Sequence, residues 1–163
     1  MVANNLLEVC VSNIAAKLEA IRTTDGYSYS RILRSVQRHN HDFPSDGFQH
    51  ITNYLQESPT IIIRTLDEDI AGDETIDRWT HRQLIDIWFV VTAGAAGDVA
   101  LNNAATDMLK ALFAVHDGFG VNARLVSMRF TRVDPVLEMP TNGVHLLLNL
   151  MYGTVIGDPT QAG

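Results

Sequence analysis

Residues 81–116 read HRQLIDIWFVVT, then AGAAG, then DVALNNAATDMLKALFAVH, which predicts a strand, a tight turn and a helix. Both faces of the strand are apolar, and Asp86 is the one charge between Leu84 and Val91. A strand with one face in water would alternate apolar and polar residues. We therefore expect a central strand that is covered on both sides. One face holds Ile85, Ile87, Phe89 and Val91, and the other holds Leu84, Trp88 and Val90.

The helix predicted after the turn runs from Asp98 to His116. Asp98 suits the N-cap, because its carboxylate accepts hydrogen bonds from free backbone N–H groups and favours the positive end of the helix dipole. Apolar residues recur every three or four positions, so one stripe covers one face of the strand. The stripe is formed by Leu101, Ala104 or Ala105, Met108, Leu112 and Val115.

A second amphipathic helix is expected near the start of the chain, from about Asn5 to Arg22. Asn5 followed by Glu8 is similar to a capping box, and the turn Thr24-Asp25-Gly26 ends the helix. Leu7, Val11, Ile14, Leu18 and Ile21 recur with helical spacing. This stripe is a candidate cover for the sheet.

The remaining segments predict more strands and their connections. The strands are Tyr27–His39, Thr60–Leu66, Arg124–Val133 and Val144–Tyr152. Residues 43–58 are interpreted as an insertion with a short helix, 67–77 as a mobile acidic hairpin loop, and 158–163 as a flexible tail. We predict a single α+β domain over residues 1–157, with a mixed or antiparallel β-sheet of four to five strands packed by two main α-helices.

The composition excludes several classes of protein. A net charge of −7 over 163 residues argues against a general binder of nucleic-acid backbones, which needs clustered Lys and Arg. The single cysteine, Cys10, excludes an internal disulfide and a cysteine-based zinc site, and we expect a buried, inert thiol. The first residues lack the basic start of a signal peptide, and the apolar run 87–96 is too short to span a bilayer. We expect synthesis in a reducing cytoplasm.

Two motifs that bind phosphate or calcium are incomplete. The turn Gly94–Gly97 lacks the Lys and Ser/Thr of a P-loop, and Asp98 places a negative charge where phosphate would sit. A calcium loop that begins at Asp67 has Ala71 at a ligand position and Arg78 in place of the final Glu. We favour a simple turn and a solvated loop, and we predict no catalytic residues and no cofactor.

Two clusters of side chains remain as candidate sites. His39, His41 and Asp42 are metal-ligand types, with His50 nearby in sequence, but no third element fixes the site and a polar loop is the favoured interpretation. Arg31, Arg34 and Arg38 form the most basic stretch, for which a salt-bridged surface is the simplest interpretation.

The order of these segments resembles the tail terminator family of long-tailed phages, the lambda-like minor tail and tail completion proteins. The resemblance spans about Leu6 to Gly157, and residues 43–58 exceed the family's usual connection. It is carried by IRTTDGYSYS with LRSVQR, by PTIIIR before the acidic loop, by RQLIDIWFVV, AATDMLKALF and RFTRVDP, and by VHLLLNLMYG.

The resemblance implies a structural virion protein rather than an enzyme. It implies a six-membered ring that caps the tail tube and joins the tail to the head or neck, after assembly in the host cytoplasm. Expected partners are further copies, the tube protein, neck or connector proteins and, in a contractile tail, the sheath protein; DNA only passes through, and no membrane is involved. The expected contact residues are Arg31, Arg34, Arg38, Asp67, Glu68, Asp69, Asp73 and Glu74.

Three alternatives remain open. The first is a related head–tail connector or neck protein. The second is a small metal-dependent enzyme that uses His39, His41 and Asp42, or acid/base chemistry in the acidic loop. The third is a monomeric binding module. A sheet that is apolar on both faces needs two helical covers or a neighbouring subunit, which favours a protein that assembles.

Overall fold

The computed structural model describes residues 5–29, 34–38, 60–73, 77–92, 97–113, 119, 123–133 and 141–162. These residues form two α-helices, a short 3-10 helix and a six-stranded sheet. In chain order the elements are α1 (Leu6–Glu19), η1 (Thr23–Asp25), β1 (Arg34–Arg38), β2 (Thr60–Asp73), β3 (Arg78–Thr92), α3 (Gly97–Phe113), β4 (Arg124–Val133), β5 (Thr141–Val155) and β6 (Asp158–Ala162).

The strands follow the order β1-β2-β3-β5-β4, and β6 pairs with β5. β1 runs parallel to β2, whereas the other neighbours are antiparallel, so the sheet is mixed. The predicted α+β class, with a mixed sheet and two main helices, is confirmed. β3 lies at the centre, as its two apolar faces predicted, and pairs along its whole length with β5.

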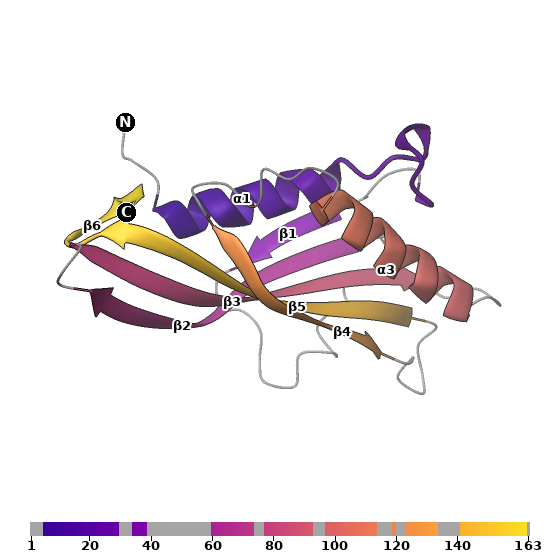
Figure 1. Cartoon of the computed structure of the whole chain (residues 1–163). Helices are drawn as coiled ribbons and strands as arrows, with labels where there is room; N and C mark the ends of the chain where they lie inside the picture. Colours follow the sequence, from indigo (N-terminus) through magenta and orange to yellow (C-terminus); the bar gives the residue numbers. More distant parts are fainter. Residues whose placement is uncertain are drawn as a thin grey trace.

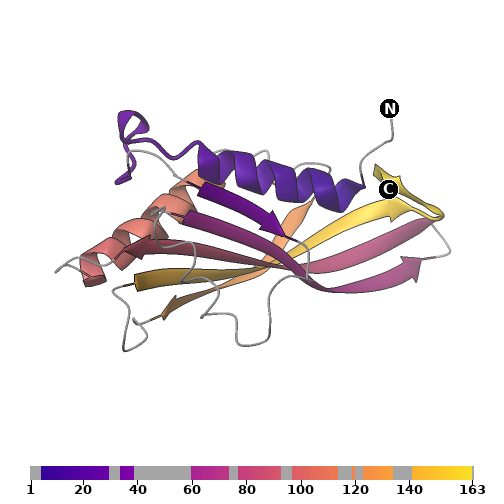
Figure 2. The same cartoon turned by 180° about the vertical axis from the view of Figure 1, so that it is seen from behind.

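Both helices lie on the same face of the sheet (Figures 1 and 2). Ile85, Ile87 and Phe89 of β3 point to this face and are 0% exposed. They pack with apolar residues of α1, α3, β2 and β5 in one core. In the described part of the chain no helix covers the opposite face. We expected both faces of β3 to be covered, but the two helices cover only one of them.

The ends of the helices follow local rules. Asn5 caps α1, since its Oδ1 accepts a hydrogen bond of 2.9 Å from the backbone N–H of Leu7. After η1 the chain turns at Gly26, whose φ of +78° favours glycine. Lys110 of α3 holds this turn by donating to the carbonyl oxygens of Asp25 and Gly26. α3 begins at Gly97, so Asp98 lies inside the helix and is not its cap.

The predicted start of the first strand, at Tyr27, is wrong. Residues 27–29 are not a strand, and β1 covers only Arg34–Arg38 among the described residues. The backbone N–H groups of Ser28 and Tyr29 donate to Asp107 Oδ2 at 2.8 and 3.1 Å. The Tyr29 hydroxyl donates to the carbonyl oxygen of Ala100. This segment therefore satisfies its polar groups against α3 rather than in the sheet.

The predicted flexible tail is also wrong for residues 158–162. These residues form β6, which turns back on β5 after Gly157 and lies beside the start of α1 (Figure 1). Gly157 has a φ of +82°, a conformation that suits a tight turn. Asp158 then accepts hydrogen bonds from Thr160 and Gln161. These local bonds order a segment whose composition indicated a loose end.

Candidate interaction surface

The acidic segment predicted as a loop from Asp67 to Asp77 is a strand as far as Asp73. Residues 68–73 pair with 78–83 of β3 after a bulge between Thr65 and Glu68. At the bulge, the buried Gln83 side chain donates to the carbonyl oxygens of Leu66 and Asp67. We predicted a loop because charged, exposed residues are uncommon in strands. Backbone pairing with β3 instead makes this segment a strand.

A polar network holds this β2–β3 hairpin to β5. Glu68 Oε1 lies 2.8 Å from His81 Nδ1 and accepts a hydrogen bond of 2.6 Å from the Tyr152 hydroxyl. His81 Nε2 lies 2.8 Å from Thr154 Oγ1, and the His81 ring stacks on Tyr152. Burial and the Glu68 carboxylate raise the pKa of Tyr152 above its ordinary value.

The hydroxyl, imidazole and carboxylate of this network have the order used in nucleophilic catalysis. Thr154, however, is 0% exposed, and His81 is 5% exposed. A substrate has no direct access to that hydroxyl. The network is therefore suited to stabilise the hairpin rather than to catalyse a reaction. Sequence spacing could not predict it, because its four residues come from three strands.

A second polar network lies on the sheet face that points away from the helices. Asp86, 1% exposed, pairs with Arg64 on β2 and His145 on β5. Trp88 Nε1 also donates to its carboxylate, and the Trp88 ring stacks on His145 at 4.4 Å. Burial by itself raises the pKa of a carboxyl, but the bonds from His145 and Arg64 hold the pKa of Asp86 below its ordinary value.

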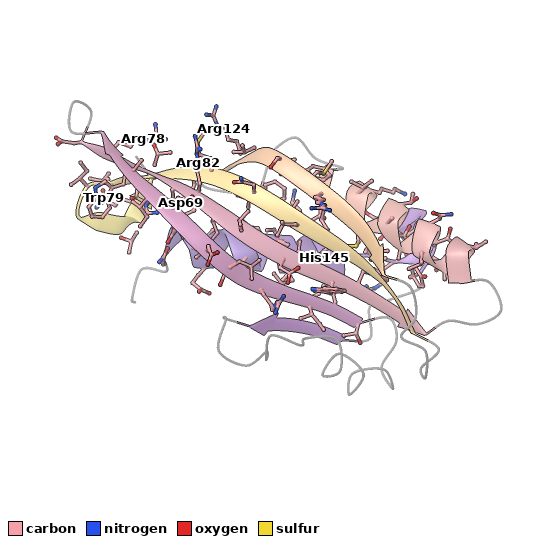
Figure 3. All side chains as sticks on the ribbon, turned by 90° about the horizontal axis from the view of Figure 1, so that it is seen from below. Asp69, Arg78, Trp79, Arg82, Arg124 and His145 are labelled. Atoms are coloured by element: carbon pink, nitrogen blue, oxygen red, sulfur yellow. The ribbon has the colours of Figure 1, made fainter. Side chains whose placement is uncertain are left out.

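A pocket opens on the same face towards the free end of the hairpin. It encloses about 340 Å³ and is lined by Arg78, Thr80, Arg124, Met151 and Tyr152. Figure 3 shows Arg78, Arg82 and Arg124 gathered at this end of the sheet, apart from His145. An acidic chain therefore presents a local group of arginines, which its net charge did not indicate.

Gly153 on β5 makes room for the Arg78 side chain. A Cβ at position 153 would lie 2.2 Å from Arg78 Nε and 2.3 Å from Arg78 Nη2. The Arg78 guanidinium therefore occupies the space that a side chain at position 153 would fill. Arg78 Nε is buried and forms no hydrogen bond with the described residues.

The structure brings some of the predicted contact residues together. Asp67, Glu68 and Asp69 lie in sequence on β2 and are exposed, with Asp73 at the end of the strand. Arg34 and Arg38 are the first and last residues of β1, at the edge of the sheet. Arg31, Glu74, His39, His41, Asp42, His50 and the insertion 43–58 lie outside the described residues.

The candidates for metal and thiol chemistry are limited. In the described ranges no group of three His, Cys, Asp or Glu side chains is placed to hold a metal ion. Cys10 is 0% exposed in the core, and burial raises the pKa of its thiol to about 11. A thiol with this pKa is a poor nucleophile, as the prediction of a buried, inert cysteine required.

No protein-family model matches the chain, and no curated protein matches it. Among the described residues, neither helix has the length and apolar character needed to cross a lipid bilayer.

Proposed function

We propose that this protein is a ring-forming structural subunit of a phage tail, of the tail terminator type, that caps the tail tube and joins it to the head or neck. The order of the elements supports the proposal: helix, strand, long hairpin, helix, and two further antiparallel strands. This is the order from which the resemblance was drawn. The proposal assigns the molecule no chemical reaction.

Among the described residues the two helices lie on one face of the sheet, and this is the observation that carries the proposal. The face without a helix holds apolar side chains beside the Asp86 network, and Leu84, Trp88 and Leu147 there are only partly exposed. A neighbouring subunit or the tube is a natural cover for such a face.

The edges of the sheet also suit a protein that assembles. β1 pairs only with Thr60–Arg64, so no described strand pairs with β2 on that side beyond residue 64. β4 forms the opposite edge of the main sheet. Free N–H and C=O groups at an edge can pair with a strand of another subunit and give a rigid ring.

The test is incubation of the purified protein with assembled tail tubes, followed by imaging. We expect density at the ends of the tubes and, by light scattering, an assembly of about six copies, the number that the resemblance implies. Binding along the tube wall, or no binding, contradicts the proposal. Leu84→Glu, on the face that no described helix covers, should abolish end binding, whereas Val99→Glu, on the exposed side of α3, should preserve it.

The competing class is a metal-dependent enzyme that uses His39, His41 and Asp42. Metal analysis of the purified protein separates the two classes. Zinc, iron or manganese bound in a one-to-one ratio favours the enzyme and counts against a purely structural role.

A further inference from the structure

One end of the sheet carries acidic groups at one side and arginines at the other. Asp67 and Asp69 are exposed on β2, beyond the residues that pair with β1, and no other described strand pairs with β2 there. Arg124 is exposed on β4, the opposite edge strand, and Arg82 is exposed on β3 between them. In Figure 3, Asp69 and Arg124 lie on opposite sides of this end of the sheet. The exposed carboxylates therefore lie on β2, and the arginines lie on β3 and β4.

The arginines in this region lack acidic partners in the described part of the chain. No ion pair joins Arg78, Arg82 or Arg124 to a described carboxylate, although Asp69 faces Arg82 in the register of β2 and β3. The hydrogen bond of Arg124 runs to the thioether sulfur of Met151 at 3.9 Å, a weak acceptor. A guanidinium gains most from a carboxylate, which accepts two parallel N–H bonds.

The pocket is lined by donor side chains of the kind that bind a carboxylate. Arg78 and Arg124 line it together with the hydroxyl of Thr80. The bare backbone at Gly153 lets the Arg78 guanidinium lie at its wall, where its Nε lacks a partner among the described residues. An incoming aspartate or glutamate side chain would give the exposed Arg124 guanidinium a stronger acceptor than the Met151 sulfur.

We propose that the arginine pocket of one copy takes the acidic β2 edge, Asp67 and Asp69, of a second copy. This contact rests on the proposed ring, and it supplies one of its interfaces. Because the two patches lie on opposite sides of the same end of the sheet, the contact is head-to-tail and repeats around a ring. The carboxylates come from a second copy of this chain, so no other acidic partner is required.

A charge exchange tests the contact. Arg124→Glu and Asp67→Lys each place like charges across it, and each variant alone should associate about tenfold more weakly than the wild type, because rim charges act on encounter and register. Mixed in equal amounts, the two variants should associate like the wild type, since every contact in an alternating ring is again oppositely charged. The measurement is light scattering or native mass spectrometry over a range of concentrations.

Matched variants control for net charge. Arg22→Glu and Glu19→Lys make the same charge changes at exposed positions, Glu19 at the end of α1 and Arg22 just before η1. Neither should alter association, and mixing them should have no effect. Gly153→Ala is a second probe, because its Cβ displaces the Arg78 guanidinium without changing charge, and it should weaken association in the same direction.

Specific outcomes overturn the inference. It fails if the wild type is monomeric at every concentration, if the variants associate like the wild type, or if the mixture does not recover. Tail-tube binding is read separately. A wild type that caps tube ends while the charge exchange has no effect retains the proposed function and loses only this contact. If the mixture recovers but the protein does not bind tail tubes, the contact between copies stands and the proposed tail function fails.

Discussion

At the scale of single residues, Asp86 is unusual because it places a charged group inside the sheet. It is a carboxylate with 1% exposure in the middle of an apolar strand. Oδ1 bonds His145 on β5, and Oδ2 accepts from Arg64 on β2 and from Trp88 on β3 itself. Burying a charge is costly unless hydrogen bonds and opposite charges compensate it. Asp86 therefore fixes how β2, β3 and β5 align on this face.

Asp86→Asn should lower the free energy of unfolding by about 2–4 kcal/mol, because Arg64 loses the opposite charge that compensates it and the hydrogen bonds of His145 and Trp88 to the carboxylate are weakened. The measurement is denaturant unfolding at neutral pH. Asp69→Asn, an exposed carboxylate on the next strand, is the control and should change stability by less than about 0.5 kcal/mol. Equal effects of the two substitutions would contradict a special role for Asp86.

The same residue predicts how stability depends on pH. The pKa of Asp86 is lower in the folded protein than its ordinary value, so its stabilising contribution is present above the unfolded pKa and is lost as pH falls through the folded pKa. The stability difference between the wild type and Asp86→Asn should therefore shrink below about pH 4. Thermal unfolding of both proteins across this range measures it.

At the scale of elements, the β2–β3 hairpin depends on side chains as well as on strand pairing. Glu68, His81 and Tyr152 connect it to β5 beyond the point where β1 ends. A two-stranded hairpin is marginally stable by itself, so this third strand and its polar contacts are needed to keep the acidic edge in place.

Tyr152→Phe removes the hydroxyl that donates to Glu68 and should destabilise the hairpin by about 1 kcal/mol. Backbone amides of residues 68–72 and 79–83 should exchange hydrogen faster, while those of α3 stay unchanged. Hydrogen exchange followed by mass spectrometry measures this difference. Tyr27→Phe is the control, because the Tyr27 hydroxyl forms no hydrogen bond with the described residues. Faster exchange throughout the chain would instead indicate a global loss of stability.

Much of this architecture follows from residue patterns. The alternation in 124–133 predicted β4, and the apolar faces of 84–91 predicted a central strand. The position of α1 beside α3 did not follow, because an apolar stripe shows that a helix is covered but not which side of the sheet covers it. The Asp86 network was also missed, since Arg64 and His145 become its neighbours only through the register of three strands.

At the scale of the whole molecule, the net charge of −7 conceals a charge separation. Copies of a uniformly acidic protein repel one another, and added salt weakens that repulsion. In this chain the arginines at one end of the sheet can attract the carboxylates of a second copy. Salt should therefore weaken the association between copies.

Self-association should fall by about tenfold as sodium chloride rises from roughly 0.05 to 0.5 M, because screening shortens the reach of exposed charges. Light scattering at a fixed protein concentration measures this change. Arg22→Glu should show the same salt dependence as the wild type, and Arg124→Glu a weaker one. Association that strengthens with salt would indicate that apolar contacts dominate.

The return of β6 along β5 to the start of α1 has a practical consequence. The first and last described segments lie next to each other, so a short Gly/Ser linker can join them into a closed chain. New ends opened between β4 and β5 would then give a circular permutant that keeps every strand neighbour. Such a rearranged chain would carry tags or labels far from the acidic hairpin.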